Sequence, residues 1–371
     1  MPAPRPSSRP RRAANAAPVG PVTAPPRHVA VVGAGMAGIA CARTLLQAGL
    51  RVTVFEKSRG PGGRMATRRT EFGSFDHGAQ FFTVRDARFS RTLKTAPGLI
   101  EPWQVNSVRV LDPLGHAMAT APAPRDTHWV ALPGMNSLVK HWAEPLLNGS
   151  LDGTLQLEAL VERIEPDALQ PQRWQLRLAC PDGAQQVVGG FDQVVLALPH
   201  QQAQQLLHSS ALAPALQRAL AKVQVAPCWT LMLAFPQATQ PELQLGPRWH
   251  AARSEHHRIR WVARETSKPG RGAIERWTVQ ASPAWSAEHL EDDPERVKAK
   301  LLKGFAEITG IRATPGHAVV HRWRYAQTQV PLGRSHLWDA KLGIGVCGDW
   351  CLGHRIEDAF VSGLELALAL A

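Results

Sequence analysis

Residues 28–57, HVAVVGAGMAGIACARTLLQAGLRVTVFEK, decide the fold of this chain. His28–Val32 is short, apolar and rich in β-branched residues, which is typical of a strand buried in a parallel sheet. The segment Met36–Gln47 predicts a helix that ends before Gly49, and Arg51–Phe55 predicts the next strand. The order strand, helix, strand within 30 residues predicts a βαβ unit of an α/β fold.

Glycines stand where this unit would meet a ligand. Gly33 allows a tight turn, Gly35 lets the backbone approach a pyrophosphate, and Gly38 lets the helix pack closely on the strand. The helix would aim its N-terminal N–H groups at the phosphates, and Glu56 would accept from a ribose hydroxyl. The sequence therefore predicts a dinucleotide site. Its candidate residues are Gly33, Gly35, Met36, Ala37, Gly38 and Glu56.

The residues after the second strand indicate which dinucleotide binds. An acid at position 56 suits a free 2′-hydroxyl, which leaves FAD or NAD. A second glycine-rich turn follows in residues 56–65, EKSRGPGGRM, and a cofactor that extends beyond the first helix would use it. This turn favours FAD; the alternative is a solvated basic loop. The turn adds Lys57, Gly63, Arg64 and Met65 to the candidates.

Several segments together resemble one family. Residues 31–45 and 52–65 look like the amino-terminal FAD signature of flavin amine oxidases, phytoene desaturases and renalases. Residues 75–83, FDHGAQFFT, and 321–326, HRWRYA, resemble the renalase branch, including its bacterial members. Residues 345–350, GVCGDW, look like the carboxy-terminal FAD motif. The resemblance covers the chain from His28 to its end.

The resemblance implies roles for further residues. Asp349 would accept from a ribityl hydroxyl, and the N–H of Ile356 would meet the flavin at a helix N-terminus. Gln80 would lie against the flavin or its ribityl chain, with Trp323 and Tyr325 near the other side. Further implied cofactor-binding residues are Gly78, Ala79, Gln80, Phe81, Val161, Gly348, Asp349, Arg355 and Ile356. The implied catalytic residues are Gln80, Trp323 and Tyr325.

The same resemblance implies an FAD-dependent oxidase. Its substrate would be a small reduced molecule, expected to be an isomer of dihydro-NAD(P), which would pass a hydride to flavin N5. O2 would be the acceptor and hydrogen peroxide the product. Two alternatives stay open: an amine oxidase or desaturase acting on another amine or alkene, and a flavin-containing binding protein without turnover.

Composition argues against several other classes. The 371 residues carry a formal net charge of +12, but no basic stripe alternates with aromatic residues, so no nucleic-acid partner is expected. No apolar run reaches the length of a membrane span. No spacing of histidines and cysteines suggests a metal site. Five cysteines at irregular spacing favour a reducing compartment, and we expect a cytoplasmic protein.

The expected architecture has two domains and a tail. Residues 1–27, rich in proline, alanine and arginine, predict a disordered tail. A discontinuous Rossmann-type FAD-binding domain, like those of glutathione reductase and amine oxidases, would comprise residues 28–85, 128–203 and 321–371. An α+β substrate domain on a mostly antiparallel sheet would comprise residues 86–127 and 204–320. It would include a helix at Pro294–Ile308, capped by Asp292 or Asp293.

Overall fold

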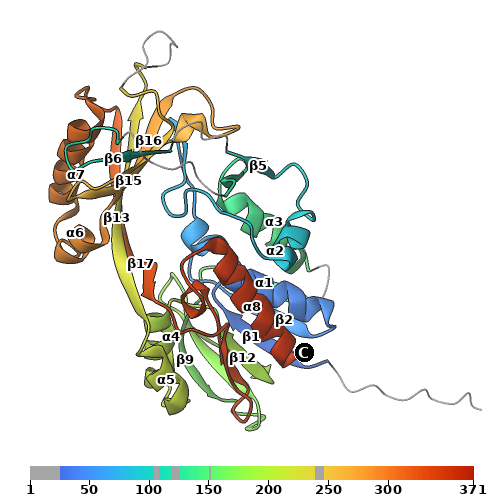
Figure 1. Cartoon of the computed structure of the whole chain (residues 1–371). Helices are drawn as coiled ribbons and strands as arrows, with labels where there is room; N and C mark the ends of the chain where they lie inside the picture. The colour runs from blue at the N-terminus through green and yellow to red at the C-terminus, as the bar shows by residue number, and fades with distance from the viewer. Residues whose placement is uncertain (1–25, 104–107, 119–125, 150–151, 239–245) are drawn as a thin grey trace, which may run out of the picture.

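The computed structural model describes residues 26–103, 108–118, 126–149, 152–238 and 246–371. All but the last two residues of the predicted tail lie outside these ranges. The described residues form two lobes, and the long strands β13 and β17 run from one toward the other (Figure 1). The mixed α/β class predicted from the sequence is confirmed.

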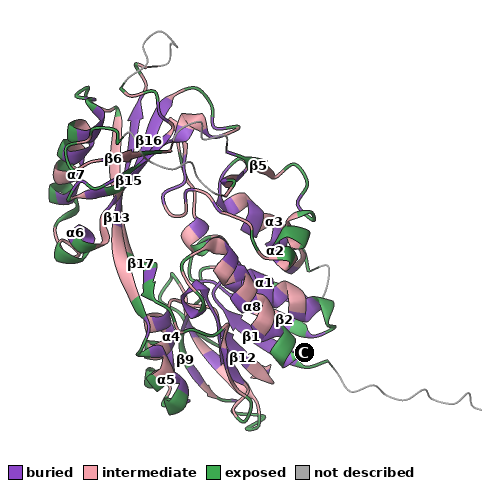
Figure 2. Cartoon of the chain, in the orientation of Figure 1, coloured by how far each residue is buried: buried purple, intermediate pink, exposed green. Residues whose placement is uncertain are grey.

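The first lobe is built on a six-stranded sheet in which only β18 runs antiparallel. In spatial order its strands are β18 (Leu337–Asp339), β19 (Ile344–Val346), β12 (Gln193–Leu196), β1 (His28–Val32), β2 (Arg51–Phe55) and β8 (Gly153–Gln156). All five residues of β1 and the last three of β12 are buried; buried residues are purple in Figure 2. Central strands that are buried on both faces explain the continuous apolar runs in the sequence.

Helices cover this sheet. Helix α1 (Met36–Gln47) packs along α8 (Ile356–Leu370), the last helix, and α3 (Asn136–Leu147) lies beside α1. Both ends of the chain thus contribute to one layer, as expected for a discontinuous domain. Elsewhere in the lobe is a three-stranded antiparallel sheet with α4 (His200–Ser209) and α5 (Pro214–Leu220). Its strands are β11 (Gln185–Phe191), β10 (Trp174–Ala179) and β9 (Leu160–Pro166).

The second lobe holds another six-stranded sheet, antiparallel except where β14 pairs with β6. Its strands, in spatial order, are β17 (His317–Val330), β13 (Gln224–Phe235), β16 (Glu275–Ala281), β15 (Ile259–Arg264), β14 (Ala251–Ser254) and β6 (Val108–Leu111). Helices α6 (Pro283–Glu288) and α7 (Pro294–Thr309) pack against it. Asp293, one of the two predicted capping residues, caps α7 by accepting from the amides of Glu295 and Arg296.

The lobes divide the chain differently from the predicted domain ranges. Residues 86–127 are shared: α2 (Ala87–Leu93) packs on α8, whereas β6 joins the second sheet. Helices α4 and α5 belong to the first lobe, because their leucines share a core with β9 and β12. The part of β17 after residue 320 stays in the second sheet. Two short pairs, β3 (Arg68–Thr70) with β4 (Gly73–Phe75) and β5 (Ile100–Pro102) with β7 (Trp129–Ala131), complete the strands described.

Candidate functional site

A cavity of about 1960 Å³ runs along the first lobe and reaches the second sheet. Pockets for drug-sized ligands usually enclose about 300–1,000 Å³, so this one has room for a dinucleotide and a second molecule. Its walls come from the turn after β1, the loop after β2, β9, the segment after β19, and strands β13 to β17.

The turn after β1 brings backbone against backbone. A Cβ atom on Gly38 would lie 1.9 Å from the carbonyl oxygen of Gly33, and one on Gly33 would lie 2.5 Å from the carbonyl oxygen of Ala197. Gly33 also has φ +104°, a conformation that favours glycine. Gly35 differs, because its nearest neighbour would be the Cα of Gly63 at 3.9 Å. Protein atoms therefore explain Gly33 and Gly38, and a ligand lying close to the backbone would explain Gly35.

Glu56 holds this turn together. Its Oε2 accepts from the N–H of Ala34 at 2.8 Å and its Oε1 from the N–H of Ser58 at 2.9 Å. The carboxylate is buried yet lines the cavity. Each carboxylate oxygen can accept more than one hydrogen bond, so the predicted ribose contact is compatible with these two bonds.

The second glycine-rich turn lies against the carboxy-terminal motif. Arg64 donates to both oxygens of Asp349, at 2.9 and 2.5 Å, and one end of its guanidinium also reaches the carbonyl of Ala326. The sequence predicts that both residues bind the cofactor, with Asp349 accepting from a ribityl hydroxyl. In the structure they pair with each other across 285 residues of chain, and both line the cavity.

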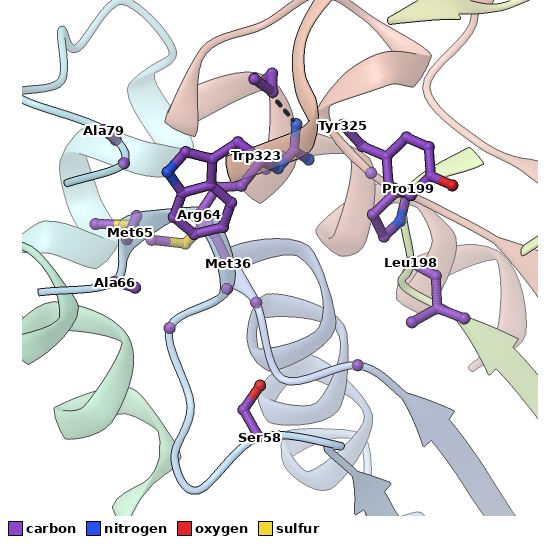
Figure 3. Close-up of a pocket in the computed structure, with 18 of the residues that line it drawn as sticks. Met36, Ser58, Arg64, Met65, Ala66, Ala79, Leu198, Pro199, Trp323 and Tyr325 are labelled. Atoms are coloured by element: carbon purple, nitrogen blue, oxygen red, sulfur yellow. Dashed lines mark hydrogen bonds between the residues drawn. The ribbon is translucent and has the colours of Figure 1, made fainter. Parts of the chain in front are cut away.

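The segment after β4 forms another part of the wall. A Cβ atom on Gly78 would lie 2.1 Å from the carbonyl oxygen of Arg64 and 3.3 Å from the ring of Trp323, so only glycine fits there. The Nε1–H of Trp323 donates to the carbonyl of His77 at 2.9 Å, and the two rings stack with centroids 5.3 Å apart. In Figure 3, Trp323 lies on the side of Ala79 and Met65, and Tyr325 on the side of Pro199 and Leu198.

Most residues predicted from the sequence meet in this cavity. Ile356 begins α8, Val161 lies in β9, and the N–H of Arg355 is bonded to Asp358 at the start of α8. The predicted residues that line the cavity are Gly33, Gly35, Met36, Ala37, Glu56, Lys57, Gly63, Arg64, Met65, Gly78, Ala79, Val161, Trp323, Tyr325, Gly348, Asp349, Arg355 and Ile356. Gly38 lies beneath the turn instead.

Gln80 and Phe81 differ from the prediction, because neither lines the cavity. Gln80 is buried, its amide nitrogen donates to the carbonyl of Asp76, and its oxygen accepts from Lys268 at 3.3 Å. Phe81 stacks on His128 with ring centroids 3.8 Å apart. In the structure both side chains are therefore taken up by packing next to the cavity.

Sequence reasoning missed the buried charge cluster formed by Asp76, Glu265, Lys268 and Arg271. Lys268 lies 3.1 Å from Asp76 and 3.0 Å from Glu265, and Arg271 lies 2.6 Å from Asp76, all with fully buried side chains. Burial alone would raise the pKa of Asp76, but Lys268 and Arg271, helped by the Met135 amide, lower it. The cluster joins the segment before Gly78 to the loop between β15 and β16. No local pattern marks it, because Asp76 lies 189 to 195 residues before the other three members.

The cavity lining is strongly cationic. It carries ten lysine and arginine side chains against three carboxylates among the described residues. The cations are Lys57, Arg59, Arg64, Arg69, Lys140, Arg253, Arg260, Arg322, Arg324 and Arg355, and the carboxylates are Glu56, Glu162 and Asp349. Burial, together with neighbouring charge, lowers the pKa of both His77 and His321 to about 4, so neither adds charge at neutral pH.

Cys347 and Cys351, which flank the Gly-Asp turn of the carboxy-terminal motif, show no sign of thiol redox chemistry. Cys347 and Cys351 do not line the cavity, and burial raises the pKa of the Cys351 thiol to about 12. All five cysteines are free. Within the described ranges, no cluster of histidine, cysteine and carboxylate side chains could hold a metal ion. No helix in the same ranges is long and apolar enough to cross a membrane.

Two family models match the chain. Residues 31–95 match a model described as NAD(P)-binding Rossmann-like domain, and residues 118–371 match one described as flavin containing amine oxidoreductase. The second match covers more than half of the chain. It extends from the segment after β6 to the end of α8, and so includes the carboxy-terminal motif.

Curated relatives match over shorter stretches. An L-amino-acid oxidase from Daboia russelii is 51% identical over 47 residues, which is 13% of this chain and 9% of that protein. A hydroxyneurosporene desaturase from Cereibacter sphaeroides is 34% identical over 137 residues, which is 37% of this chain and 22% of that protein. The matched part thus spans a tenth to a fifth of these relatives' length.

Solved structures match over nearly the whole chain. A protein from Exiguobacterium sp. 255-15, assigned as a protoporphyrinogen oxidase, aligns with a TM-score of 0.71 and 14% identity, covering 93% of this chain and 98% of its own. Cyclohexylamine oxidase from Brevibacterium oxydans aligns with a TM-score of 0.69 and 14% identity, covering 93% and 99%. At such low identity these alignments establish the fold alone.

Proposed function

The chain belongs to the flavin containing amine oxidoreductases, a family of FAD-dependent enzymes, and from this premise we propose a renalase-type oxidase. Its substrate would be a small reduced anion, an isomer of dihydro-NAD(P), with O2 as acceptor. The support for this finer assignment is the resemblance of residues 75–83 and 321–326 to the renalase branch, together with the charge of the cavity.

The residues present fit FAD. Gly35 has space where a pyrophosphate would approach, and the carboxylate of Glu56 lies beside the same turn. Gly348 and Asp349 line the cavity near the N-terminus of α8, where backbone N–H groups favour negative charge. When bound, FAD would supply two-electron acceptor chemistry that no side chain here can provide. Trp323 and Tyr325, from β17, would flank the substrate on the side of the second sheet.

The observation that carries this proposal is the charge of the substrate wall, defined as the cavity-lining residues of strands β13 to β17. It contains four arginines and no carboxylate among the described residues: Arg253, Arg260, Arg322 and Arg324. Such a wall repels a protonated amine and attracts a phosphate-bearing molecule. The chain also has a single tyrosine, Tyr325, so it cannot form a cage from two tyrosines around an amine.

The substrate wall and His77, which stacks on Trp323 of that wall, would bind and orient rather than transfer protons. His77 and His321 have pKa values lowered to about 4 and are therefore neutral at pH 7. The stacked rings of His77 and Trp323 form a flat surface that a nicotinamide ring could lie against. Oxidation of a dihydronicotinamide moves a hydride from its ring carbon and leaves the aromatic product, so the protein need supply no general base.

Anaerobic mixing tests the proposal. The flavin-loaded protein is mixed with chemically re-reduced NAD, which contains the isomers, and its visible absorbance is followed. We expect rapid bleaching with this mixture and much slower bleaching with ordinary NADH, then recovery and hydrogen peroxide when O2 is admitted. Bleaching by amines alone, with aldehyde and ammonia as products, would instead identify an amine oxidase. A flavin that no donor bleaches would indicate a binding protein without turnover.

The cysteines bear on the cell compartment and on how the flavin is attached. The five free cysteines favour a reducing compartment such as the cytoplasm. The buried, protonated state of Cys351 favours non-covalent flavin. Acid precipitation of the purified protein should therefore leave the yellow colour in the supernatant.

A further inference from the structure

The arginines of the substrate wall fall into two kinds. Arg322 and Arg324 both bond to Glu291, with distances of 2.9 Å from Arg322 Nη1 and from Arg324 Nη2 to its Oε2. Arg253 in β14 and Arg260 in β15 have no carboxylate or hydrogen-bond partner among the described residues. Both are exposed and line the cavity, so their charge is available to a ligand.

The sheet places both arginines next to Trp261. Arg253 pairs directly with Trp261 across β14 and β15, and Arg260 precedes Trp261 in the chain. Residues that follow one another in a strand normally face opposite sides of the sheet. Here the register between β15 and β16 shifts between Ile259 and Trp261, so a bulge at Arg260 lets both Arg260 and Trp261 line the cavity.

This part of the wall also has a hydrogen-bond donor without an acceptor. The Nε1–H of Trp261 is buried and has no acceptor among the described residues. Trp261 also packs on Phe81, with ring centroids 5.6 Å apart, which ties this part of the wall to the segment that carries Gly78. The charge of Arg253 also reaches His128, which stacks on Phe81. After burial, Arg253 is the next cause of the lowered pKa of His128.

We infer that Arg253 and Arg260 form an anion subsite that binds a phosphate or carboxylate group of the substrate while the reacting ring lies nearer Trp323. The inference rests on the proposed function for the identity of the reacting group, but not for the anion contact itself. Two guanidinium groups can bind such oxygens in bidentate fashion, which gives orientation as well as affinity. The bulge in β15 would then serve to present Arg260.

Binding of ADP-ribose to the flavin-loaded protein tests the subsite without turnover, because this molecule carries the diphosphate and lacks nicotinamide. Calorimetry would compare wild type with Arg253→Gln and Arg260→Gln. We expect each substitution to weaken binding by about tenfold or more, as is usual for hydrogen bonds to charged groups. The Lys variants should retain part of the affinity. Arg218→Gln removes an equally exposed charge from α5, away from the cavity, and should change nothing.

Binding of succinate, which carries carboxylates and no phosphate, is measured in the same way. Arginine-dependent binding of succinate in place of ADP-ribose would assign the subsite to carboxylates, and the reverse would assign it to phosphates. In turnover, the Gln variants should raise KM for the active donor more than they lower kcat. Unchanged binding of both probes in both Gln variants would overturn the subsite, even if dihydronicotinamides bleach the flavin. If binding of a probe depends on these arginines but no dihydronicotinamide bleaches the flavin, the subsite is supported and the proposed function is contradicted.

Discussion

The two sides of the cavity are built in different ways. The cofactor side depends on backbone: the glycine turn leaves no room for a side chain at Gly33 or Gly38, and Glu56 bonds to amides. The substrate wall depends on side chains that strand pairing brings together, such as Arg253, which lies opposite Trp261. Backbone geometry requires particular residues at fixed spacing, whereas a wall of side chains can change with the ligand.

The sharpest way to test this contrast is to add one methyl group on the cofactor side. Gly38→Ala would place a Cβ 1.9 Å from the carbonyl oxygen of Gly33, so we expect a loss of about 3 kcal/mol or more in the free energy of unfolding. Gly35→Ala has no such clash and should keep the stability of the flavin-free protein. It should nevertheless lose bound flavin, because the methyl group occupies the space that the ligand needs.

Urea unfolding and the flavin content of the purified proteins would measure both variants. Equal loss of stability in the two would show that Gly35 also serves packing. Full flavin content in Gly35→Ala would contradict a close approach of the cofactor at this turn.

The same contrast explains what could be predicted from the sequence. The first strand, α1 and the second strand match their predicted ranges, because glycines and apolar periodicity encode them locally. Gln80 was misplaced, since a motif gives the position of a residue but not the direction of its side chain. Arg253, Arg260 and Lys268 could not be found, because only the pairing of distant strands and the packing of the lobes bring them to the site.

A second test concerns how firmly the two sides are joined. Asp76→Ala leaves Lys268 and Arg271 buried without their shared partner, and breaking a buried ion pair costs about 3–5 kcal/mol. We expect a loss of stability of that size. Asp126→Ala, which breaks the exposed pair with Arg85, is the matched control and should cost far less. Similar unfolding midpoints for the two variants would show that the buried charge cluster does not hold the lobes together.

Lower pH should reduce the stability of the protein through His77, which stacks on Trp323 of the substrate wall. His77 contacts His321 and Trp323, with Arg68 and Asp76 nearby, and its pKa is lowered to about 4. The unfolded chain takes up a proton below pH 6.5, but the folded protein does so only near pH 4. The stability is therefore fully present above pH 6.5 and falls as the pH drops toward 4, by about 2–3 kcal/mol for this residue.

His77→Phe keeps an aromatic ring and removes the titration. Unfolding measured at intervals between pH 4 and 7 should show a shallower slope than in wild type, with the remaining slope due in part to His321. An unchanged slope would mean that His77 is protonated equally in the folded and unfolded states.

The smallest effect is expected at Tyr325, which the resemblance implied to be catalytic. Tyr325 lines the cavity from β17, but its hydroxyl makes no hydrogen bond with any described residue, so we expect the ring rather than the hydroxyl to matter. Tyr325→Phe should change kcat/KM by less than about threefold, which corresponds to less than one hydrogen bond. Tyr325→Leu should have a larger effect, because the flat face of the ring is lost. If Tyr325→Phe instead abolished the flavin bleaching measured anaerobically, a proton from the substrate wall would enter the reaction, and the wall would do more than bind and orient.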